Sequence, residues 1–322
     1  MTGRSRRAHV DFRGEHLMRR AHAAAQGLSD HDIAELVKSG DMVCVHRGIY
    51  APGDHYRHLD SDRRHLLTLR AHLMCCTSDV FAGHQSAALL HGMQLLRRPS
   101  LVHLATTRAA GGHVTATRHV HAEGLDPVDV CVVDGCATTT AARTVADLAR
   151  VLPFEDAVCV GDSALRRGLT VIDDVIEALD RTGTSSGRVA ARAALRFLSP
   201  ASESVGESRS RVYFRHFGIP QPELQVTLVL DDGTEVRPDF LWDDAGVLGE
   251  FDGKSKYGRL ARPDESPADV VHREKLREDR LRAQGWRVVR WGTPDLRDGR
   301  LARRLTGLLF DVPAGRPTTR RR

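Results

Sequence analysis

The stretch that decides the fold of the C-terminal third is 236–254, which reads VRPDFLWDDAGVLGEFDGK. Its two apolar runs, separated by a short polar segment, predict two neighbouring β-strands. Side chains alternate along a strand, so Glu250, Asp252 and Lys254 share one face of the second strand. Asp239 lies in the first strand, eleven positions before Glu250. The pattern therefore predicts a group of carboxylates with a lysine beside it.

Carboxylates gathered on adjacent strands repel one another, and a hard divalent cation bound through oxygen relieves that repulsion. We therefore expect Asp239, Glu250 and Asp252 to bind Mg²⁺ or Mn²⁺. Such a cation lowers the pKa of its bound water and stabilises charge that develops on a phosphate. Lys254 can position the attacking water. Glu207, from the preceding segment, can hold a metal-bound water and complete the site.

A plainer interpretation stays open, in which Asp239 and Glu250 are ordinary strand carboxylates paired with Arg237 and Lys254. Acids inside strands, with only Lys254 as an evident partner on their face, favour the metal site over this interpretation. The charged helix further along offers Lys275 or Arg277 for contact with a phosphate.

The C-terminal third of the chain, about 200–311, alternates between helical and extended segments. The apolar periodicity and an Asp-Gly turn predict a mixed sheet with helices on its faces. The expected elements are a helix over 203–217, a strand over 224–230, a turn at 231–234, strands over 236–242 and 247–254, a helix over 270–284 and a strand over 286–291.

The pattern at the N-terminal end, over 10–53, predicts a winged helix-turn-helix. A helix over 15–25 is followed by a second helix over 29–38, for which Ser29 is an N-cap candidate and Gly40 a terminator. Short apolar runs on either side of 46–48 predict a hairpin. In the functional interpretation the second helix enters a major groove of DNA and Arg47 contacts phosphate.

The middle region carries weaker chemical signals. We expect helices over 81–95, 138–149, 154–165 and 171–179, and strands over 101–105, 114–120 and 128–133. His84, His91 and Asp147 can form a polar site, although such residues more often cap helices or satisfy buried partners. The seventeen histidines are scattered and none has HExxH or CxxH spacing, so we expect no zinc site.

Polar, Pro-rich and Gly-rich stretches at 51–54 and 181–204 predict the boundaries between units, and no internal repeat is evident. The expected division is a winged helix at 10–53, a mixed α/β middle region at 60–198, a nuclease-like domain at 200–311 and a basic disordered tail at 312–322.

Composition excludes several classes of protein. The 322 residues are 41% apolar and 28% charged with a formal net charge of +5, which excludes a wholly disordered chain. No apolar run approaches the roughly 20 residues of a membrane helix, and no signal peptide is evident. The six cysteines show no CxxC motif and no disulfide-like spacing, so we expect reduced thiols in a cytoplasm.

The third unit resembles the PD-(D/E)xK nuclease superfamily, and within it an uncharacterised domain family related to very-short-patch-repair endonucleases. The resemblance covers about 202–309, a third of the chain. It implies a restriction-endonuclease-like mixed sheet flanked by helices, within an α/β (overall α+β) chain. The residues that carry it are Glu207-Ser208-Arg209, Gln225, Arg237-Pro238-Asp239-Phe240, Glu250-Phe251-Asp252-Gly253-Lys254, 274–279, Leu281 and 285–290.

One departure from the superfamily pattern leaves the register open. The pattern asks for an acid, any residue and then a lysine. If Glu250 is the acid, Asp252 occupies the lysine position, whereas Asp252-Gly253-Lys254 fits if Asp252 is the acid. The related domain family favours Glu250 as the ligand, and then Lys254, Lys256 or Lys275 replaces the missing lysine.

The N-terminal and middle regions resemble AbiEi-type antitoxins. In the first of them the resemblance rests on Gly27-Leu28-Ser29, Leu36-Val37, Ser39-Gly40 and the run from Val43 to Tyr50; in the second it rests on SAALLHG and TTTAARTVADLA. It implies a winged helix that binds promoter DNA, and a cognate toxin protein as a further partner.

Together these patterns predict a DNA-binding, metal-dependent nuclease that hydrolyses phosphodiester bonds. A homodimer is a further expectation, since cleavage of both strands needs two active sites. The alternative is a non-enzymatic DNA-binding regulator or an AbiEi-like antitoxin, whose nuclease-like domain is inactive.

Overall fold

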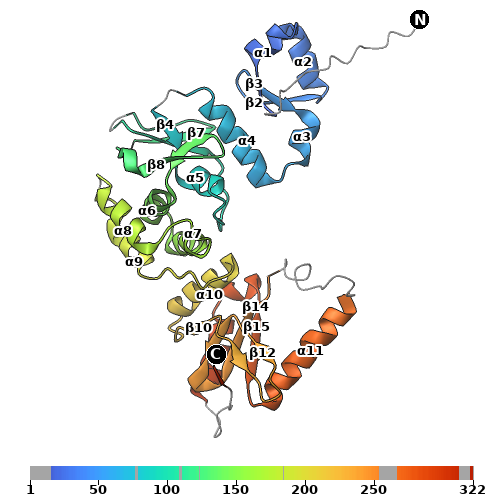
Figure 1. Ribbon diagram of the computed structural model, residues 1–322, viewed down its shortest axis with the longest axis vertical. Coiled ribbons are helices and arrows are strands. Elements are labelled where there is room, and N and C mark those ends of the chain that lie inside the picture. The colour runs from blue at the N-terminus through green and yellow to red at the C-terminus, as the bar shows by residue number, and fades with distance from the viewer. Residues whose placement is uncertain are drawn as a thin grey trace, which may run out of the picture. The chain divides into compact units, whose positions relative to one another are not determined.

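The computed structural model describes residues 16–76, 79–108, 111–122, 124–183, 185–253, 267–311 and 320–321. Helices and mixed sheets alternate along these residues, which confirms the predicted α/β fold class (Figure 1). The chain divides into two compact units. One comprises Met1–Leu148 and Asp173–Arg188, and the other comprises Ala149–Ile172 and Val189–Arg322. The predicted middle region, 60–198, therefore contributes to both units.

The first unit opens with short elements in the order expected of a winged helix. The side chain of Ser29 accepts a hydrogen bond from the backbone N–H of Asp32, whose carboxylate accepts one from the Ser29 N–H. This capping box starts the second helix at the predicted place. The elements are β1 (Met18–Arg19), α1 (Arg20–Ala25), α2 (Asp30–Lys38), β2 (Met42–His46) and β3 (Ile49–Pro52), and the strands form a sheet in the order β1-β3-β2.

Two local predictions in this part are wrong. The helix expected over 15–25 is shorter among the described residues, because Met18–Arg19 pair with β3 as a strand. The break expected at 51–54 is the end of β3 and the start of α3 (Gly53–His58). A glycine is required there, since a Cβ at this first position of α3 would stand 1.8 Å from the carbonyl oxygen of Gly40.

A six-stranded mixed sheet follows, in the order β6-β7-β5-β4-β9-β8. The pairs β5–β7 and β4–β9 are parallel, and the other neighbours are antiparallel. Helices α4 (Ser61–Leu73) and α5 (His84–Leu90) pack against sheet residues Leu104 and Val120 in one apolar core. The strands are β4 (Val80–Ala82), β5 (Val102–Thr106), β6 (His113–Val114), β7 (Arg118–Ala122), β8 (Val130–Val133) and β9 (Cys136–Thr139).

Three predictions here mistook strand for helix or ran past a turn. The helix expected over 81–95 begins only at His84, because the two residues at 81–82 pair in β4. The strand expected over 114–120 is the hairpin of β6 and β7. The helix expected over 138–149 begins at Ala141, since the β-branched threonines at 138–139 pair in β9.

A buried ion cluster connects α6 (Ala141–Val151), α8 (Ile172–Arg181) and the 3₁₀ turn Pro127–Asp129 within the first unit. Arg143 lies 2.8 Å from carboxylate oxygens of both Asp129 and Asp147, and Arg181 lies 2.8 Å from the other oxygen of Asp129. The Arg143 side chain is 0% exposed. Buried charges of this kind are tolerated only with partners, so this cluster fixes how these elements pack.

Removing the central cation of this cluster should destabilise the protein strongly. Arg143→Met removes the guanidinium that two buried carboxylates share and leaves Asp129 with Arg181, and we expect the free energy of unfolding to fall by about 3–5 kcal/mol in urea denaturation. As a matched control, Arg98→Met removes a half-exposed pair with Asp62, and it should cost below about 1 kcal/mol. Equal effects of the two variants would contradict the structural role of the buried cluster.

The protonation of His72 should make stability depend on pH. His72 is buried on α4, and its ring meets that of His46 edge to face. Burial, followed by His46 and Arg118, lowers the pKa of His72 to about 4. In the unfolded chain the His72 imidazole takes up its proton near the ordinary pKa of 6.5. The contribution of neutral His72 to the free energy of unfolding is therefore complete above pH 6.5 and is lost as pH falls towards 4.

Between pH 7.5 and pH 4.5 the melting temperature of His72→Leu should therefore fall by fewer degrees than that of the parent protein. His31→Leu, on the exposed face of α2, serves as the control and should follow the parent. If His72→Leu and the parent lose the same number of degrees, the proton does not enter at this ring.

The second unit holds a four-stranded mixed sheet, β10-β13-β14-β15, and a small sheet, β12-β11-β16. The strands β14 and β15 are parallel, and β13 runs antiparallel to β14. The strands are β10 (Glu223–Leu224), β11 (Leu228–Val229), β12 (Glu235–Val236), β13 (Phe240–Trp242), β14 (Val247–Phe251), β15 (Arg287–Trp291) and β16 (Arg320–Arg321). The helices are α7 (Phe154–Arg166), α9 (Arg188–Leu195), α10 (Val205–His216), α11 (Pro267–Ala283) and α12 (Arg300–Phe310).

The element order of this unit follows the sequence prediction, with local corrections. The strands expected over 224–230 and 236–242 are each divided into two short strands. The break expected at 181–204 contains α9. In the tail expected to be disordered, Arg320–Arg321 pair with β11, and 312–319 lie outside the described residues.

The apolar core of the sheet forms as the pattern indicates. Trp286 and Trp291 are 1% and 2% exposed and pack in the core. Within the described ranges no helix is long and apolar enough to cross a membrane. All six cysteines are free thiols, as expected from their spacing.

Candidate active site

The predicted acidic residues are positioned by one helix and two strands of the second unit. Glu207 lies in the first turn of α10, Asp239 directly precedes β13, and Glu250 lies in β14. The β13–β14 ladder pairs Phe240 with Gly249, so Asp239 and Glu250 lie next to each other in the adjoining row. The three acids are only 2%, 9% and 8% exposed, respectively.

Gln225 connects two of these carboxylates. Its side-chain amide donates to Glu207 Oε2 at 3.0 Å and to Asp239 Oδ1 at 3.3 Å. The other oxygen of Asp239 accepts the backbone N–H of Phe251 at 2.8 Å. Gln225 has a φ of +54°, which interrupts the predicted strand and turns its side chain to this position. From the sequence, Gln225 is expected only as part of the resemblance to PD-(D/E)xK nucleases.

Glu207 is held by its own helix start as well. Its Oε1 accepts the hydroxyl of Ser204 and its Oε2 accepts the backbone N–H of Glu203, each at 2.8 Å. Ser204 is also the N-cap of α10. Glu207 is therefore fixed in orientation by three donors, which suits a residue that positions other groups.

Glu250 is paired with two arginines. Arg277 from α11 contacts Oε1 at 2.9 Å, and Arg290 from β15 contacts Oε2 at 2.9 Å. Arg290 also lies 3.8 Å from Asp252, whose side chain is 47% exposed. The shared arginine agrees with the prediction that Glu250 and Asp252 lie on one face. Figure 1 shows α11 beside the strands that carry these residues.

These contacts differ from the plainer interpretation of the sequence, which paired Asp239 with Arg237. Arg237 instead contacts Glu203 at 2.7 Å. Lys254 lies outside the described residues, as does Lys256, and Lys275 is exposed on α11. The structure therefore does not test which residue fills the lysine position of the motif.

The donor set suits a hard cation in type. Among the described residues, no three carboxylates bring oxygens within 4.8 Å of one another. Mg²⁺, however, is usually held by one or two protein carboxylates together with water and phosphate oxygens. Asp239 and Glu250, neighbours across the β13–β14 ladder, match that number of carboxylates, and Asp252 directly follows β14 with an exposed side chain.

The predicted polar site of His84, His91 and Asp147 does not assemble as one group. Asp147 belongs to the ion cluster with Arg143, and the Nε2 of His91 lies 2.7 Å from the carbonyl oxygen of Thr139. His84 stacks on His121 with ring centroids 3.6 Å apart.

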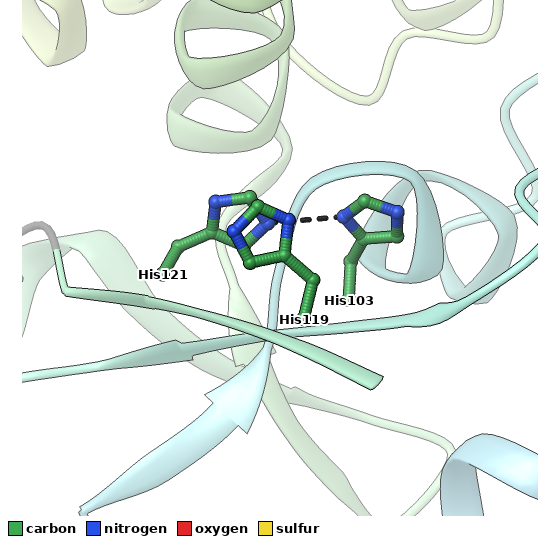
Figure 2. Close-up of side chains that lie close together, drawn as sticks. All are labelled: His103, His119 and His121. Atoms are coloured by element: carbon green, nitrogen blue, oxygen red, sulfur yellow. Dashed lines mark hydrogen bonds between the residues drawn. The ribbon is translucent and has the colours of Figure 1, made fainter. Parts of the chain in front are cut away.

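A histidine cluster forms on the six-stranded sheet instead, although the spacing of the histidines predicted no zinc site. His103, His119 and His121 come from β5 and β7, and their rings gather above these strands (Figure 2). Burial, followed by His84 and His119, lowers the pKa of His103 to about 4. The missed signal is His-x-His in a predicted strand, because period two places both rings on one face.

The exposed face of α2, the expected DNA-reading helix, is mainly acidic. Its exposed charged side chains are Asp30, Asp32, Glu35 and Lys38, and the first of these pairs with Arg20. Arg47 in the β2–β3 turn is exposed, as a phosphate contact requires. The negative charge on α2 opposes insertion into a groove lined by phosphates.

No family model matches the chain. Two uncharacterised proteins of Mycobacterium tuberculosis, from strains CDC 1551 / Oshkosh and ATCC 25618 / H37Rv, are each 31% identical to the chain over 175 residues. The match covers 54% of this chain and 62% of the length of each relative. Their names state no activity.

Gln225→Leu should destabilise the second unit, because it removes the amide between two buried carboxylates. We expect the free energy of unfolding to fall by about 1–3 kcal/mol at pH 7, the cost of a lost donor to buried charged groups. The control is Gln221→Leu, whose exposed side chain donates to the backbone oxygen of Arg211 and should change stability by about 0.5 kcal/mol or less. If the two variants unfold at the same urea concentration, the Gln225 amide does not contribute to the stability of the second unit.

Proposed function

We propose that the second unit is a metal-dependent phosphodiesterase that acts on DNA. The observation that carries the proposal is the convergence of Glu207, Asp239 and Glu250 at one end of the mixed sheet, with Gln225 between the first two. Burying acids is costly, which makes a group of buried carboxylates a candidate functional site. The resemblance to PD-(D/E)xK nucleases supports the same assignment.

Asp239 and Glu250 are the residues that would hold Mg²⁺ or Mn²⁺ in this site. When bound, the cation would supply positive charge to the phosphate and acidity to a coordinated water. Gln225 orients Asp239, and Glu207 fixes the amide of Gln225 from the other side. Asp252 is accessible to solvent at the rim, where it can accept a hydrogen bond from water.

The two arginines at Glu250 give this site its affinity for an anion. The side chains of Arg277 and Arg290 are 28% and 31% exposed, and guanidinium groups bind phosphate in a bidentate manner. The guanidinium groups and a cation compete for the Glu250 carboxylate. A phosphate that binds the guanidinium groups leaves this carboxylate to the cation, so substrate binding and metal binding favour each other.

The same pairing favours a second candidate function. If both arginines stay on Glu250, the carboxylate is neutralised and the domain binds DNA without cleaving it. This is the non-enzymatic regulator. The acidic face of α2 disfavours the regulator. That function would require the winged helix to bind an operator, and acidic side chains repel DNA phosphates.

Asp239→Asn should abolish cleavage while the protein stays folded. The test is nicking of supercoiled plasmid at low salt, with Mg²⁺, Mn²⁺ or EDTA. We expect metal-dependent nicking by the parent and a rate at least about 100-fold lower in the variant, because losing a ligand costs more than losing a second-layer partner. Asp244→Asn, which alters an exposed acid in the same unit, should cut like the parent.

If the parent and Asp239→Asn retard DNA equally and neither cuts it, the proposed nuclease function is wrong and the non-enzymatic regulator is favoured. Cutting at the parent rate by a folded Asp239→Asn variant would show that the catalytic residues lie elsewhere. Circular dichroism of each variant separates loss of activity from loss of fold.

A further inference from the structure

A second site lies in the first unit and is independent of the proposed nuclease. The parallel register of β5 and β7 pairs His103 with His119, and His121 with Ala105. Period two then places His119 and His121 on one face of β7, beside His103 on the neighbouring strand. Ala105 has only a methyl group, which leaves room for the rings to approach one another.

The three imidazoles present ligand atoms to one point. One ring nitrogen of each lies within 4.8 Å of the others, and His103 Nδ1 is 3.0 Å from His121 Nε2. A tetrahedral zinc ion with nitrogen ligands at roughly 2.0–2.1 Å keeps those nitrogens roughly 3.4 Å apart. The His103–His121 separation is about 0.4 Å shorter than that spacing and all three nitrogens lie within 4.8 Å of one another, so small rotations of the rings would complete the geometry. Figure 2 shows the three rings side by side.

The surroundings hold the cluster in place. His84 is fully buried at the start of α5 and stacks on His121 with the ring planes 16° apart. It has a φ of +49°, an uncommon conformation for a residue other than glycine. The backbone N–H of His103 donates to the Ser86 hydroxyl at 2.8 Å, and that hydroxyl also contacts His65. The Ser86 contact fixes the β5 backbone at His103, and the stack on His84 fixes the plane of the His121 ring.

We propose that His103, His119 and His121 bind one transition-metal cation of the zinc class, which cross-links β5 to β7. Imidazole nitrogen selects zinc, copper or nickel over magnesium, so this site and the carboxylates of the second unit take different cations. Three protein ligands leave the fourth tetrahedral position to water. His84 is a positioning residue that packs on one ligand ring.

The test uses the full chain, produced without a polyhistidine tag and dialysed against EDTA. Titration calorimetry with Zn²⁺ should give one high-affinity ion per chain, and Co²⁺ should give the intense visible absorption of a tetrahedral complex. His119→Gln should weaken Zn²⁺ binding by at least about 100-fold. The matched control is His113→Gln, an exposed histidine on β6 of the same sheet, which should bind as the parent does.

Two further measurements keep the result unambiguous. Zn²⁺ should raise the melting temperature of the parent and of Asp239→Asn equally, and it should not raise that of His119→Gln. Since His121→Asn alters a different ligand, it should repeat the loss if His119→Gln proves unstable. Absence of Zn²⁺ binding by the parent would overturn the proposal in favour of a hydrogen-bonded histidine stack. Unchanged affinity in both folded variants would identify binding to other histidines and also overturn it.

Discussion

The second unit depends on one constraint: every carboxylate buried at the end of its mixed sheet needs donors. Glu207, Asp239 and Glu250 lie within a few residues of the apolar core, where an unpaired charge would cost several kcal/mol. The chain meets the requirement with three different kinds of donor. A helix start serves Glu207, a ladder N–H and an amide serve Asp239, and two arginines serve Glu250.

Close packing brings these donors within reach. Gly206 on α10 stands against Phe251, where a Cβ would come within 1.9 Å of the ring, so the helix lies directly on β14. Gly249 similarly lies under Trp291 and Trp242. Larger residues at either glycine would push the helix or the indoles outward and open the distance between the acids. The geometry of the site is therefore set by apolar contacts as much as by charge.

The sequence predicted the fold class, the element order of the C-terminal third and the carboxylates that cluster there. These follow from period-two and period-3.6 patterns and from turn residues, which are local signals. The interruption at Gln225 was not predictable, because LQVTLVL has strong strand propensity and only contacts with Glu207 and Asp239 explain the left-handed backbone. The His-x-His pattern at 119–121 indicates two rings of the histidine cluster, but the third ring depends on the pairing of β5 with β7, which no local pattern specifies. The function itself stays a prediction.

The division into two units has a consequence for the connectivity of the chain. The backbone passes from the first unit to the second after Leu148, returns after Ile172 and leaves again after Arg188. Three crossings mean that no single proteolytic cut releases either unit intact. A fragment that starts near residue 200 would lack α7, whose buried Asp162 is the partner of Arg211 on α10. The C-terminal part is thus assembled from a discontinuous chain, and its folding must wait for segments on both sides of α8.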